Sequence, residues 1–589
     1  MPGKRKPYVM TRGKIIFDIS GNYCDSPALL LQSDIFMEIL TRFIERIASK
    51  ESHIYSHIKA NVPLRKQGSL PMYMAGLFRL LATHTAAEIA ALGNTYNKVL
   101  SEKSSVLEFV EELYNYWRRF ERFLYMEAPK RSRYTTSSIH HSQFIKTNTE
   151  LKNLVLETYR QIRENLIGSN PRSYRQLPAG ANMGMLLERI QWDCPELYQR
   201  IREIPFIRLT IMESPLILYP KANTRKGSFE EIKKLTEDMI LLVNEQWFCY
   251  PAKVGPLTAF IYFHQDFISQ ALSLCNLFEI SDYEDIENKR PDMLLFYGLK
   301  TVDITAGTAF YEDGQNKMFI GLVQHSEDID YFGYFKKLPL TLHNMTMLKR
   351  KRLPVHGAMV YLTLKDGSSA GIVIIGDSGA GKSESLEALR TLAQEHIRDI
   401  TVVFDDMGSL ALNDDGELVG YGTEIGAFVR LDDLHPGYAY EEIDRSIFMN
   451  PDKINARLII PVTTYNYITK GFDIDIVLYA NNYEDVDSQK KIIDLFGNAG
   501  EALEVFRNGA RCAKGTTDEK GIVNTYFANP FGAPQRREIH EELAAFYFNK
   551  MFDTGVRVGQ IRTRLAIKGY AQEGPKEAAL ELLKFIQKT

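Results

Sequence analysis

A glycine-rich segment at residues 376–383 has the residue pattern with the clearest chemistry. It reads Gly-Asp-Ser-Gly-Ala-Gly-Lys-Ser, and Glu384 follows it. Glycines at this spacing let the backbone turn tightly and direct its N–H groups at a polyphosphate. Lys382 can then reach the β- and γ-phosphates, and the Ser383 hydroxyl can bind Mg²⁺. The pattern predicts a P-loop that binds ATP with Mg²⁺, formed by Gly376, Asp377, Ser378, Gly379, Ala380, Gly381, Lys382, Ser383 and Glu384.

Two carboxylates follow an apolar run beyond this loop. Residues 400–404 read Ile-Thr-Val-Val-Phe, and Asp405 and Asp406 come directly after them. A strand that ends in an acid, placed after a P-loop, brings that acid close to the Mg²⁺ of the nucleotide. The segment therefore predicts a strand that ends at a second, acidic part of the same site.

Arg457 directly precedes the apolar run Leu-Ile-Ile-Pro at residues 458–461, so it begins an apolar segment. A guanidinium carried into an apolar strand is costly unless it faces an anionic partner. A γ-phosphate is one such partner, and a carboxylate is the structural alternative. Both interpretations remain open at this point.

The flanking segments predict the elements that must position these residues. The β-branched run at 371–375 predicts a strand before the glycine-rich segment, and residues 384–389 predict a helix after it. Alternating or apolar runs predict further strands at 206–211, 216–219, 293–297 and 317–323.

The first part of the chain is predicted to be mainly helical. Apolar residues recur at helical spacing at 35–47, 72–92, 106–123 and 151–167. Polar or glycine-rich stretches predict surface loops at 132–142, which contains His140 and His141, and at 168–184. Helices are also predicted at 228–244, at 440–448, and from 555 to the C-terminus.

These patterns predict an α/β (α+β) protein with three parts. Residues 1–204 form a mainly helical N-terminal region, 205–330 a mixed α/β domain, and 331–589 a nucleotide-binding domain. A protein partner could bind through the helical N-terminal region.

Composition narrows the class of protein. The 589 residues carry a net charge of −3, which argues against a dedicated nucleic-acid binder. No apolar run approaches the ~20 residues of a membrane span, and no apolar segment follows the basic N-terminus as in a signal peptide. The five cysteines are scattered and odd in number, which favours free thiols in a reducing cytoplasm.

Residues 330–567 resemble the ATP-dependent phosphoenolpyruvate carboxykinases, with several motifs in the order that this family has. They comprise Tyr331-x-Gly333-x-x-Lys336-Lys337, His356, the P-loop, Asp405-Asp406, Asn455-x-Arg457, Ala513-Lys514-Gly515-Thr516, Phe531-Gly532-Ala533-Pro534, Asp553-Thr554-Gly555 and Thr563-Arg564. The glycine-rich segment and His356-Gly357 also resemble the HPr kinases. The resemblance implies a carboxykinase-like nucleotide-binding core.

The resemblance also implies roles for individual residues. Lys337, His356 and Asp406 would hold Mn²⁺, and Ser383 and Asp405 would bind the Mg²⁺ of the nucleotide. Lys382 and Arg457 would neutralise the transferring phosphoryl group. The other residues that it implies are Lys336 and Arg430 in catalysis and Arg557, Arg562 and Thr563 in nucleotide binding. A lysine binds a metal only as a neutral amine, so the pKa of Lys337 must be lowered, by burial and by neighbouring cations such as Lys336.

Some positions depart from the family. Its substrate-binding arginine has no convincing match, and the nearest candidate is Arg225 within residues 222–228. Met407 replaces an acid, and Arg430 replaces a lysine, although Glu424 matches the family's acid nearby.

Three functions therefore stay open. The first is an authentic carboxykinase, which decarboxylates oxaloacetate and phosphorylates the enolate. The second is an ATP-dependent phosphotransferase with a small-molecule or protein acceptor, with Asp405 or Asp406 as the base; this one is favoured because the substrate-binding arginine has no clear match. The third is a nucleotide-binding regulatory or scaffold protein.

Overall fold

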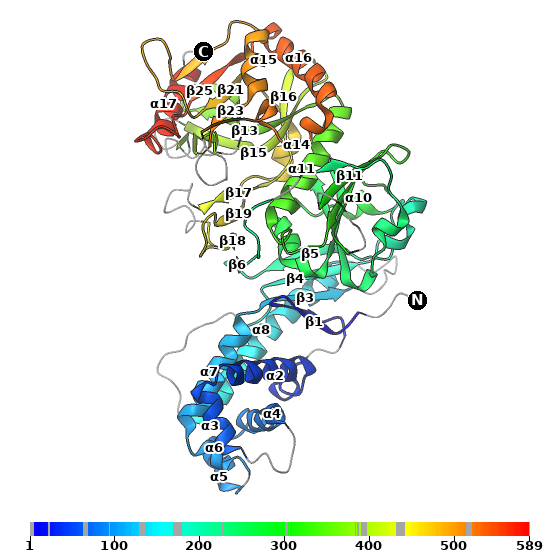
Figure 1. Cartoon of the computed structure of the whole chain (residues 1–589), viewed down its shortest axis with the longest axis vertical. Helices are drawn as coiled ribbons and strands as arrows, with labels where there is room; N and C mark the ends of the chain where they lie inside the picture. The colour runs from blue at the N-terminus through cyan, green and yellow to red at the C-terminus, as the bar shows by residue number, and fades with distance from the viewer. Residues whose placement is uncertain are drawn as a thin grey trace. The chain divides into compact units, whose positions relative to one another are not determined.

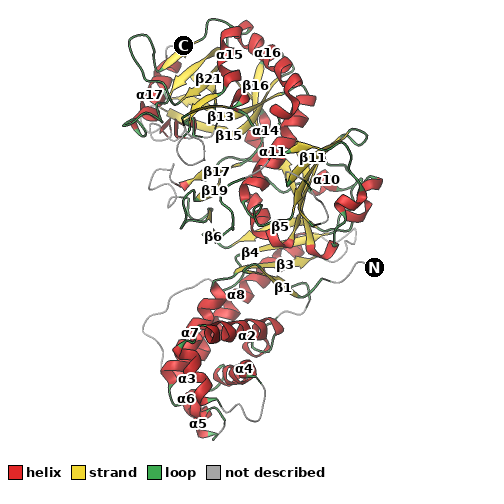
Figure 2. Cartoon of the chain, in the orientation of Figure 1, coloured by secondary structure: helices red, strands yellow, loops and turns green. Residues whose placement is uncertain are grey.

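The computed structural model describes most of the chain. The described residues are 5–21, 24–62, 69–93, 95–128, 137–168, 179–225, 228–300, 304, 307–377, 379–382, 384–385, 388–389, 397–431, 442–513 and 521–587. The chain divides into two compact units (Figure 1): unit 1 comprises residues 3–189 and 207–213, and unit 2 comprises residues 190–206 and 214–589. Helices and large sheets occur together, so the predicted mixed α/β class is confirmed (Figure 2).

Unit 1 combines a group of helices with a sheet. Its strands follow the order β1-β2-β3-β4-β5. Some of the helices begin at side-chain caps: the Ser33 hydroxyl accepts the N–H of Phe36 at the start of α2, and Thr85 and Glu88 form a capping box at the start of α5. The elements are α1 (Pro27–Leu30), α2 (Asp34–Ser49), α3 (His53–Asn61), α4 (Leu70–Leu81), α5 (Ala86–Ala91), α6 (Asn97–Leu100), α7 (Lys103–Arg118), α8 (Ser137–Ile167), β1 (Tyr8–Thr11), β2 (Lys14–Asp18), β3 (Glu121–Glu127), β4 (Met183–Glu188) and β5 (Phe206–Met212).

Two details of the sequence prediction in unit 1 are wrong. The helix predicted to reach residue 123 ends at Arg118, because residues 121–127 form β3, which pairs in parallel with both β2 and β4. Pairing on both sides of the strand overrides the helical spacing of its apolar residues. The polar segment with His140 and His141 is not a loop in its described part, since α8 begins at Ser137.

The first sheet of unit 2 contains β8 (Trp247–Val254), β9 (Leu257–His264), β10 (Met293–Leu299), β12 (Met318–Gln324), β11 (Thr308–Asp313) and β7 (Glu230–Glu231), in that order. β10 pairs in parallel with β9 and with β12, so the carboxyl ends of these three strands meet at one edge. The helix predicted at 228–244 is absent. Residues 230–231 pair with β11 instead, and only the short 3₁₀ turns η2 (Glu237–Ile240) and η3 (Asn244–Gln246) follow.

The second sheet of unit 2 has the order β20-β16-β15-β13-β14-β21-β25-β22. Its strands are β13 (Leu353–Leu364), β14 (Ser369–Ile375), β15 (Ile397–Leu412), β16 (Leu418–Gly422), β20 (Phe472–Asp473), β21 (Ile476–Asn481), β22 (Ile493–Leu495) and β25 (Arg557–Arg562). A smaller sheet joins β17 (Gly426–Arg430), β19 (Arg457–Pro461), β18 (Ile447–Met449) and β6 (Leu216–Leu218), and a ribbon pairs β23 (Ala510–Cys512) with β24 (Ile522–Asn524). The helices of unit 2 include α9 (Ile268–Leu272), α10 (Tyr283–Ile286), α11 (Phe332–Lys349), α14 (Tyr465–Lys470), α15 (Ala499–Asn508), α16 (Arg537–Asp553) and α17 (Glu573–Gln587).

Three predictions for this region need correction. β15 does not end at Asp405 and Asp406 but continues to Leu412, because residues 408–412 pair with β16. The helix predicted at 440–448 is not found in its described part, where residues 447–449 form a strand between β19 and β6. The helical start predicted after residue 555 is β25, which lies between β21 and β22.

The strand before the glycine-rich segment is buried on both faces. Val373 and Ile375 of β14 pack in a cluster with α15 and α16, whereas Ile372 and Ile374 pack in another with α17. This explains why the strand reads as a continuous apolar run rather than an alternating one. In the described residues, no helix combines the length and apolar character needed to cross a membrane. All five cysteines are free thiols, as predicted.

Candidate nucleotide and metal site

The glycine-rich segment begins directly after β14 and is held by the ends of neighbouring strands. The Gly376 N–H donates to the His356 carbonyl of β13 at 3.1 Å, and the Thr563 hydroxyl after β25 donates to the Ala380 carbonyl at 3.0 Å. Gly381 has a φ of +99°, and a Cβ there would lie 2.6 Å from the Thr563 hydroxyl oxygen. The positive φ and this close approach both require glycine at position 381.

Lys382 and Asp377 are buried within the segment. The Lys382 ammonium donates to the carbonyl oxygens of Gly376 at 2.7 Å and Asp377 at 3.1 Å. The Asp377 carboxylate accepts from Arg511 at 3.0 Å and from the Thr525 hydroxyl at 2.8 Å. Lys382 thus lies against the glycine-rich loop, and a bound anion would compete with the two carbonyl oxygens for the Lys382 ammonium.

Some predicted nucleotide ligands can be placed only in part. Glu384 is half-buried and helical, and Gly379 has a φ of +80°. Ser378 and Ser383 lie outside the described residues, as do Lys514, Gly515 and Thr516.

The Asp406 carboxylate is contacted by three side chains that come from two separate motifs. Lys336 and Lys337 of α11 donate to its Oδ2 at 2.8 and 2.5 Å, and His356 Nε2 lies 2.8 Å from its Oδ1. His356 Nδ1 also lies 3.7 Å from Asp377 Oδ1, which connects this group to the glycine-rich segment. The predicted ligands Lys337, His356 and Asp406 are therefore together in space.

The contacts of His356 define which of its nitrogens carries hydrogen. Its Nδ1 lies 2.6 Å from the Ala528 carbonyl oxygen, which can only accept, so Nδ1 must be protonated. Burial lowers the pKa of His356, with the nearby Lys382 cation acting in the same direction, which favours the neutral ring. In that neutral ring Nε2 has a lone pair that faces the Asp406 carboxylate at 2.8 Å, and two acceptors at this distance need either a proton or a metal ion between them.

The ionisation of the group matches the chemistry of a metal-binding lysine. Burial lowers the pKa of Lys337, assisted by the Lys336 ammonium, although Asp406 acts in the opposite direction. The pKa of Lys336 is raised, because attraction to Asp406 and Glu424 outweighs its burial. The pKa of Asp406 lies well below its usual value despite burial, because both lysines favour the carboxylate.

Glu424 completes the buried charge group. Its carboxylate lies 3.1 Å from the Lys336 ammonium, and burial raises its pKa to about 7. Asp405 is half-buried one residue before Asp406, and it pairs in register with Ala358 of β13.

Arg430 and Arg457 lie directly opposite each other on β17 and β19. Like charges at opposed positions of an antiparallel pair repel each other. The Arg457 guanidinium lies 5.2 Å from the centre of the Phe428 ring, and its buried Nε has no hydrogen-bond partner in the described part of the chain. Phe428 packs in turn against Phe332 at the start of α11, the helix that carries Lys336 and Lys337.

Arg225, the weak candidate for substrate binding, lies beside this group. Its guanidinium is 5.5 Å from the centre of the Phe531 ring, and the Lys337 ammonium is 4.4 Å from the same centre. Burial lowers the pKa of Arg225, whereas Tyr334 and Tyr331 raise it. This placement was hard to predict from the sequence, because residues 222–228 match the corresponding element of the carboxykinases poorly.

The three nucleotide residues predicted on or after β25 differ in position. Thr563 contacts the glycine-rich segment as described. Arg562 is buried and bound to Glu484 at 2.9 Å and to Asp494, so contact with a nucleotide would require exchange of one of these pairs. Arg557 lies at the opposite end of β25, in register with Ile476, and packs over Phe585 at 4.6 Å. The structure does not bring Arg557 to the site.

Sequence reasoning missed the residues that hold the site in place. Arg511 and Thr525 fix Asp377, and the Asn482 amide donates to the Gly379 carbonyl at 2.9 Å. They come from β23, from just beyond β24 and from the end of β21, so only the tertiary structure brings them together.

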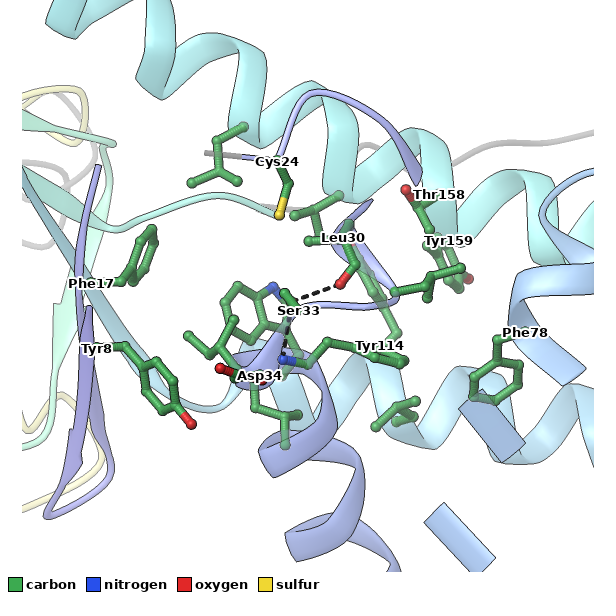
Figure 3. Close-up of a pocket in the computed structure, with 18 of the residues that line it drawn as sticks. Tyr8, Phe17, Cys24, Leu30, Ser33, Asp34, Phe78, Tyr114, Thr158 and Tyr159 are labelled. Atoms are coloured by element: carbon green, nitrogen blue, oxygen red, sulfur yellow. Dashed lines mark hydrogen bonds between the residues drawn. The ribbon is translucent and has the colours of Figure 1, made fainter. Parts of the chain in front are cut away.

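A separate cavity lies within unit 1 (Figure 3). It has a volume of about 390 Å³ and a largely apolar wall that includes Phe17, Leu30 and Trp117. Tyr114 faces it, and the buried Tyr114 hydroxyl lacks a hydrogen-bond partner among the described residues. None of the predicted nucleotide or metal ligands lines this cavity.

Comparison with known proteins adds no family assignment. No protein-family model matches the chain, and no curated protein is significantly similar to it.

Proposed function

We propose that the protein is an ATP- and divalent-metal-dependent phosphotransferase with a carboxykinase-like nucleotide-binding core. Its acceptor is a small molecule or a protein hydroxyl rather than oxaloacetate. One observation carries the proposal: Lys337 of α11, His356 of β13 and Asp406 of β15 contact one another, and His356 Nδ1 lies 3.7 Å from Asp377 Oδ1 of the glycine-rich segment.

The donor set suits a transition metal such as Mn²⁺. It offers an amine with a lowered pKa, an imidazole nitrogen with a lone pair and a carboxylate. A metal bound there would supply a Lewis acid beside the phosphoryl group. Lys382, Ser383 and Asp405 would hold ATP and its Mg²⁺.

The residues of the chain would divide the work of phosphoryl transfer. Lys382 leaves its two loop carbonyls to bind the phosphates, and Arg457 stabilises the charge that develops on the transferring group. Lys336 remains charged and holds Asp406 in place. Phosphate oxygens between Arg430 and Arg457 would remove the repulsion between these opposed guanidinium groups.

Oxaloacetate remains the second candidate acceptor because of Arg225. This guanidinium shares the Phe531 ring with Lys337 and is therefore close enough to the group to contact an anionic acceptor. Phosphotransfer without oxaloacetate is favoured because a dicarboxylate is best held by several fixed bidentate donors, and among the described residues Arg225 is the one arginine that lies over Phe531 beside Lys337.

A regulatory or scaffold role, with a protein partner bound by unit 1, is the least supported alternative. A protein that has lost catalysis has no need to keep Lys336, Lys337, His356 and Asp406 in mutual contact.

ATP turnover tests the proposal directly. Full-length protein with Mg²⁺, Mn²⁺ and γ-labelled ATP is incubated with candidate acceptors, and label transfer and phosphate release are measured. We expect turnover that is lost in Lys382→Ala but kept in Lys576→Ala, an exposed lysine of α17. Unchanged ATP affinity and turnover in Lys382→Ala would refute the proposal.

A further inference from the structure

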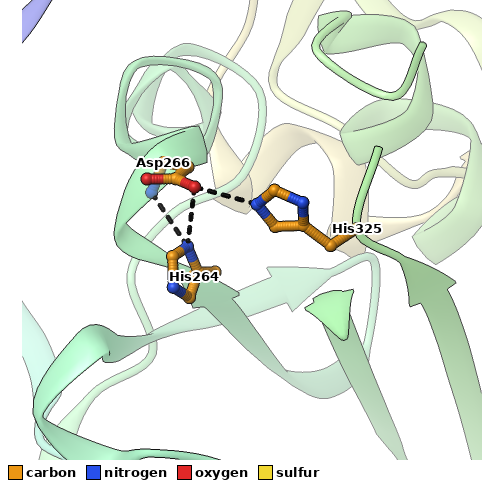
Figure 4. A group of neighbouring side chains, drawn as sticks. All are labelled: His264, Asp266 and His325. Atoms are coloured by element: carbon orange, nitrogen blue, oxygen red, sulfur yellow. Dashed lines mark hydrogen bonds and ion pairs between the residues drawn. The ribbon is translucent and has the colours of Figure 1, made fainter. Parts of the chain in front are cut away.

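A second group of side chains of the types that bind metals lies in unit 2, outside the site described above (Figure 4). His264 ends β9, Asp266 follows in the 3₁₀ turn η4 (Gln265–Phe267), and His325 follows β12. Because β9, β10 and β12 are parallel, both histidines lie at the same edge of the sheet. The crevice at the carboxyl ends of parallel strands is the common ligand position in open α/β sheets.

The distances within the group fit one metal ion. Asp266 Oδ2 lies 3.4 Å from His264 Nδ1 and 2.8 Å from His325 Nε2, and the three ligand atoms all lie within 4.8 Å of one another. Ligands about 2.0–2.1 Å from a tetrahedral Zn²⁺ are separated by roughly 3.3 Å. Exposure is 2% for the His264 side chain, 10% for Asp266 and 14% for His325, so water competes little for these atoms.

Two contacts define the tautomer of His264. Its Nε2 lies 3.2 Å from Gln246 Oε1, which can only accept, and its Nδ1 accepts the N–H of Asp266 at 3.2 Å. Both contacts require hydrogen on Nε2 and a lone pair on Nδ1. Such a second hydrogen bond is what fixes the ring of a metal-binding histidine. The Lys300 ammonium also lies 3.2 Å from Nε2, but it can only donate, so with hydrogen on Nε2 the two groups are neighbours without a hydrogen bond.

We propose that His264 Nδ1, Asp266 Oδ2 and His325 Nε2 bind one divalent transition-metal ion. Two imidazoles with one carboxylate favour Zn²⁺, Fe²⁺ or Co²⁺ over Mg²⁺ and Ca²⁺, which prefer oxygen ligands. The ion replaces the Asp266 N–H contact of Nδ1 and joins the ends of β9 and β12. The chain just beyond His325 leads to α11, so the metal fixes the entry to the helix that carries Lys336 and Lys337.

Anomalous diffraction tests the site without any variant. Crystals of the full-length protein are soaked in Zn²⁺ alone and measured on both sides of the zinc absorption edge. We expect a peak within about 2.5 Å of His264 Nδ1 and His325 Nε2, allowing for coordinate error. A peak absent there at saturating Zn²⁺ overturns the proposal.

Solution binding separates this site from the one at Asp406. Zn²⁺ content after dialysis is measured for wild type, Asp266→Asn, His325→Gln, His356→Ala and, as a control, His53→Ala, whose side chain is 77% exposed. Asp266→Asn and His325→Gln should each bind about one equivalent less than wild type. His356→Ala should keep this equivalent, and His53→Ala should match wild type. Wild-type content in a folded Asp266→Asn protein would contradict the proposal.

Discussion

Lys336 and Lys337 are adjacent in the chain and contact the same carboxylate oxygen of Asp406, yet their pKa values shift in opposite directions. Lys336 also contacts Glu424, so two carboxylates raise its pKa. Among the described residues, Lys337 contacts one carboxylate directly, that of Asp406, and it lies beside the Lys336 cation. One lysine is thus suited to remain an ammonium, and the other to become a neutral metal ligand.

This difference predicts unequal effects on Mn²⁺ binding. Changes in residues that merely support a metal ligand weaken affinity by about 10–100-fold, so loss of the ligand itself in Lys337→Ala should cost at least ~100-fold. Lys336→Met should cost less, because it removes a neighbour of the metal rather than a ligand. Electron paramagnetic resonance titration with Mn²⁺ measures both variants. Equal effects of the two changes would contradict the assignment of Lys337 as the ligand.

Anomalous diffraction locates the same ion independently. Mn²⁺-soaked crystals should show a peak within about 2.5 Å of His356 Nε2, allowing for metal–nitrogen lengths and coordinate error. A map without a peak there at saturating Mn²⁺ would exclude the site.

Gly381 offers a test of the glycine-rich segment. In Gly381→Ala, the new Cβ would approach the Thr563 hydroxyl oxygen to 2.6 Å at a φ of +99°. The loop must shift, so ATP affinity should fall at least ~10-fold, about 1.4 kcal/mol. Gly367→Ala is the matched control, since its φ is +95° and nothing lies within 4 Å of its Cβ. Calorimetry with ATP that gave the same affinity for both variants would show that the approach to Thr563 does not matter.

The strand before the glycine-rich segment could be predicted from sequence because it depends on local order. The group of Lys337, His356 and Asp406 was expected only from the resemblance to the carboxykinases, because its members come from α11, β13 and β15. The end of β15 could not be predicted, because residues 408–412 are strand through pairing with β16 and, as far as Leu410, with β13. Two further placements depend on tertiary structure, because they join residues far apart in the chain. Arg225 lies over the Phe531 ring, and His264 lies close to His325.

Buried histidines predict a loss of stability at mildly acidic pH. His343 of α11 is fully buried, and burial lowers its pKa from 6.5 to about 4. Between pH 6.5 and about 4, His343 binds a proton more readily in the unfolded state than in the folded state. Its contribution to the free energy of unfolding is therefore fully present above pH 6.5 and is lost as the pH falls toward about 4. At pH 5 the linkage relation gives a loss of ~2 kcal/mol from this residue.

His343→Gln tests that contribution, because glutamine can still donate to Asn344 but does not titrate. Denaturant unfolding of both proteins at pH 7 and pH 5 gives the difference. The variant should lose ~2 kcal/mol less than wild type between the two values. A parallel loss in both proteins would assign the pH dependence to other groups, such as His540, whose pKa is also lowered to about 4.

The identity of the acceptor gives the last prediction. A carboxykinase must hold both carboxylates of oxaloacetate, and rigid, bidentate arginines do this best. Around Asp406, Lys336 is already bound to two carboxylates, and Arg225 lies over the face of Phe531. Poor positioning of the substrate removes most of the catalysis in phosphoryl transfer. We therefore expect little or no phosphoenolpyruvate from oxaloacetate, ATP, Mg²⁺ and Mn²⁺ in a coupled assay. Turnover in the typical enzyme range of roughly 1–10³ s⁻¹ would instead establish the carboxykinase reaction. If that turnover fell in Arg225→Lys but not in the control Arg200→Lys, Arg225 would be its substrate-binding arginine.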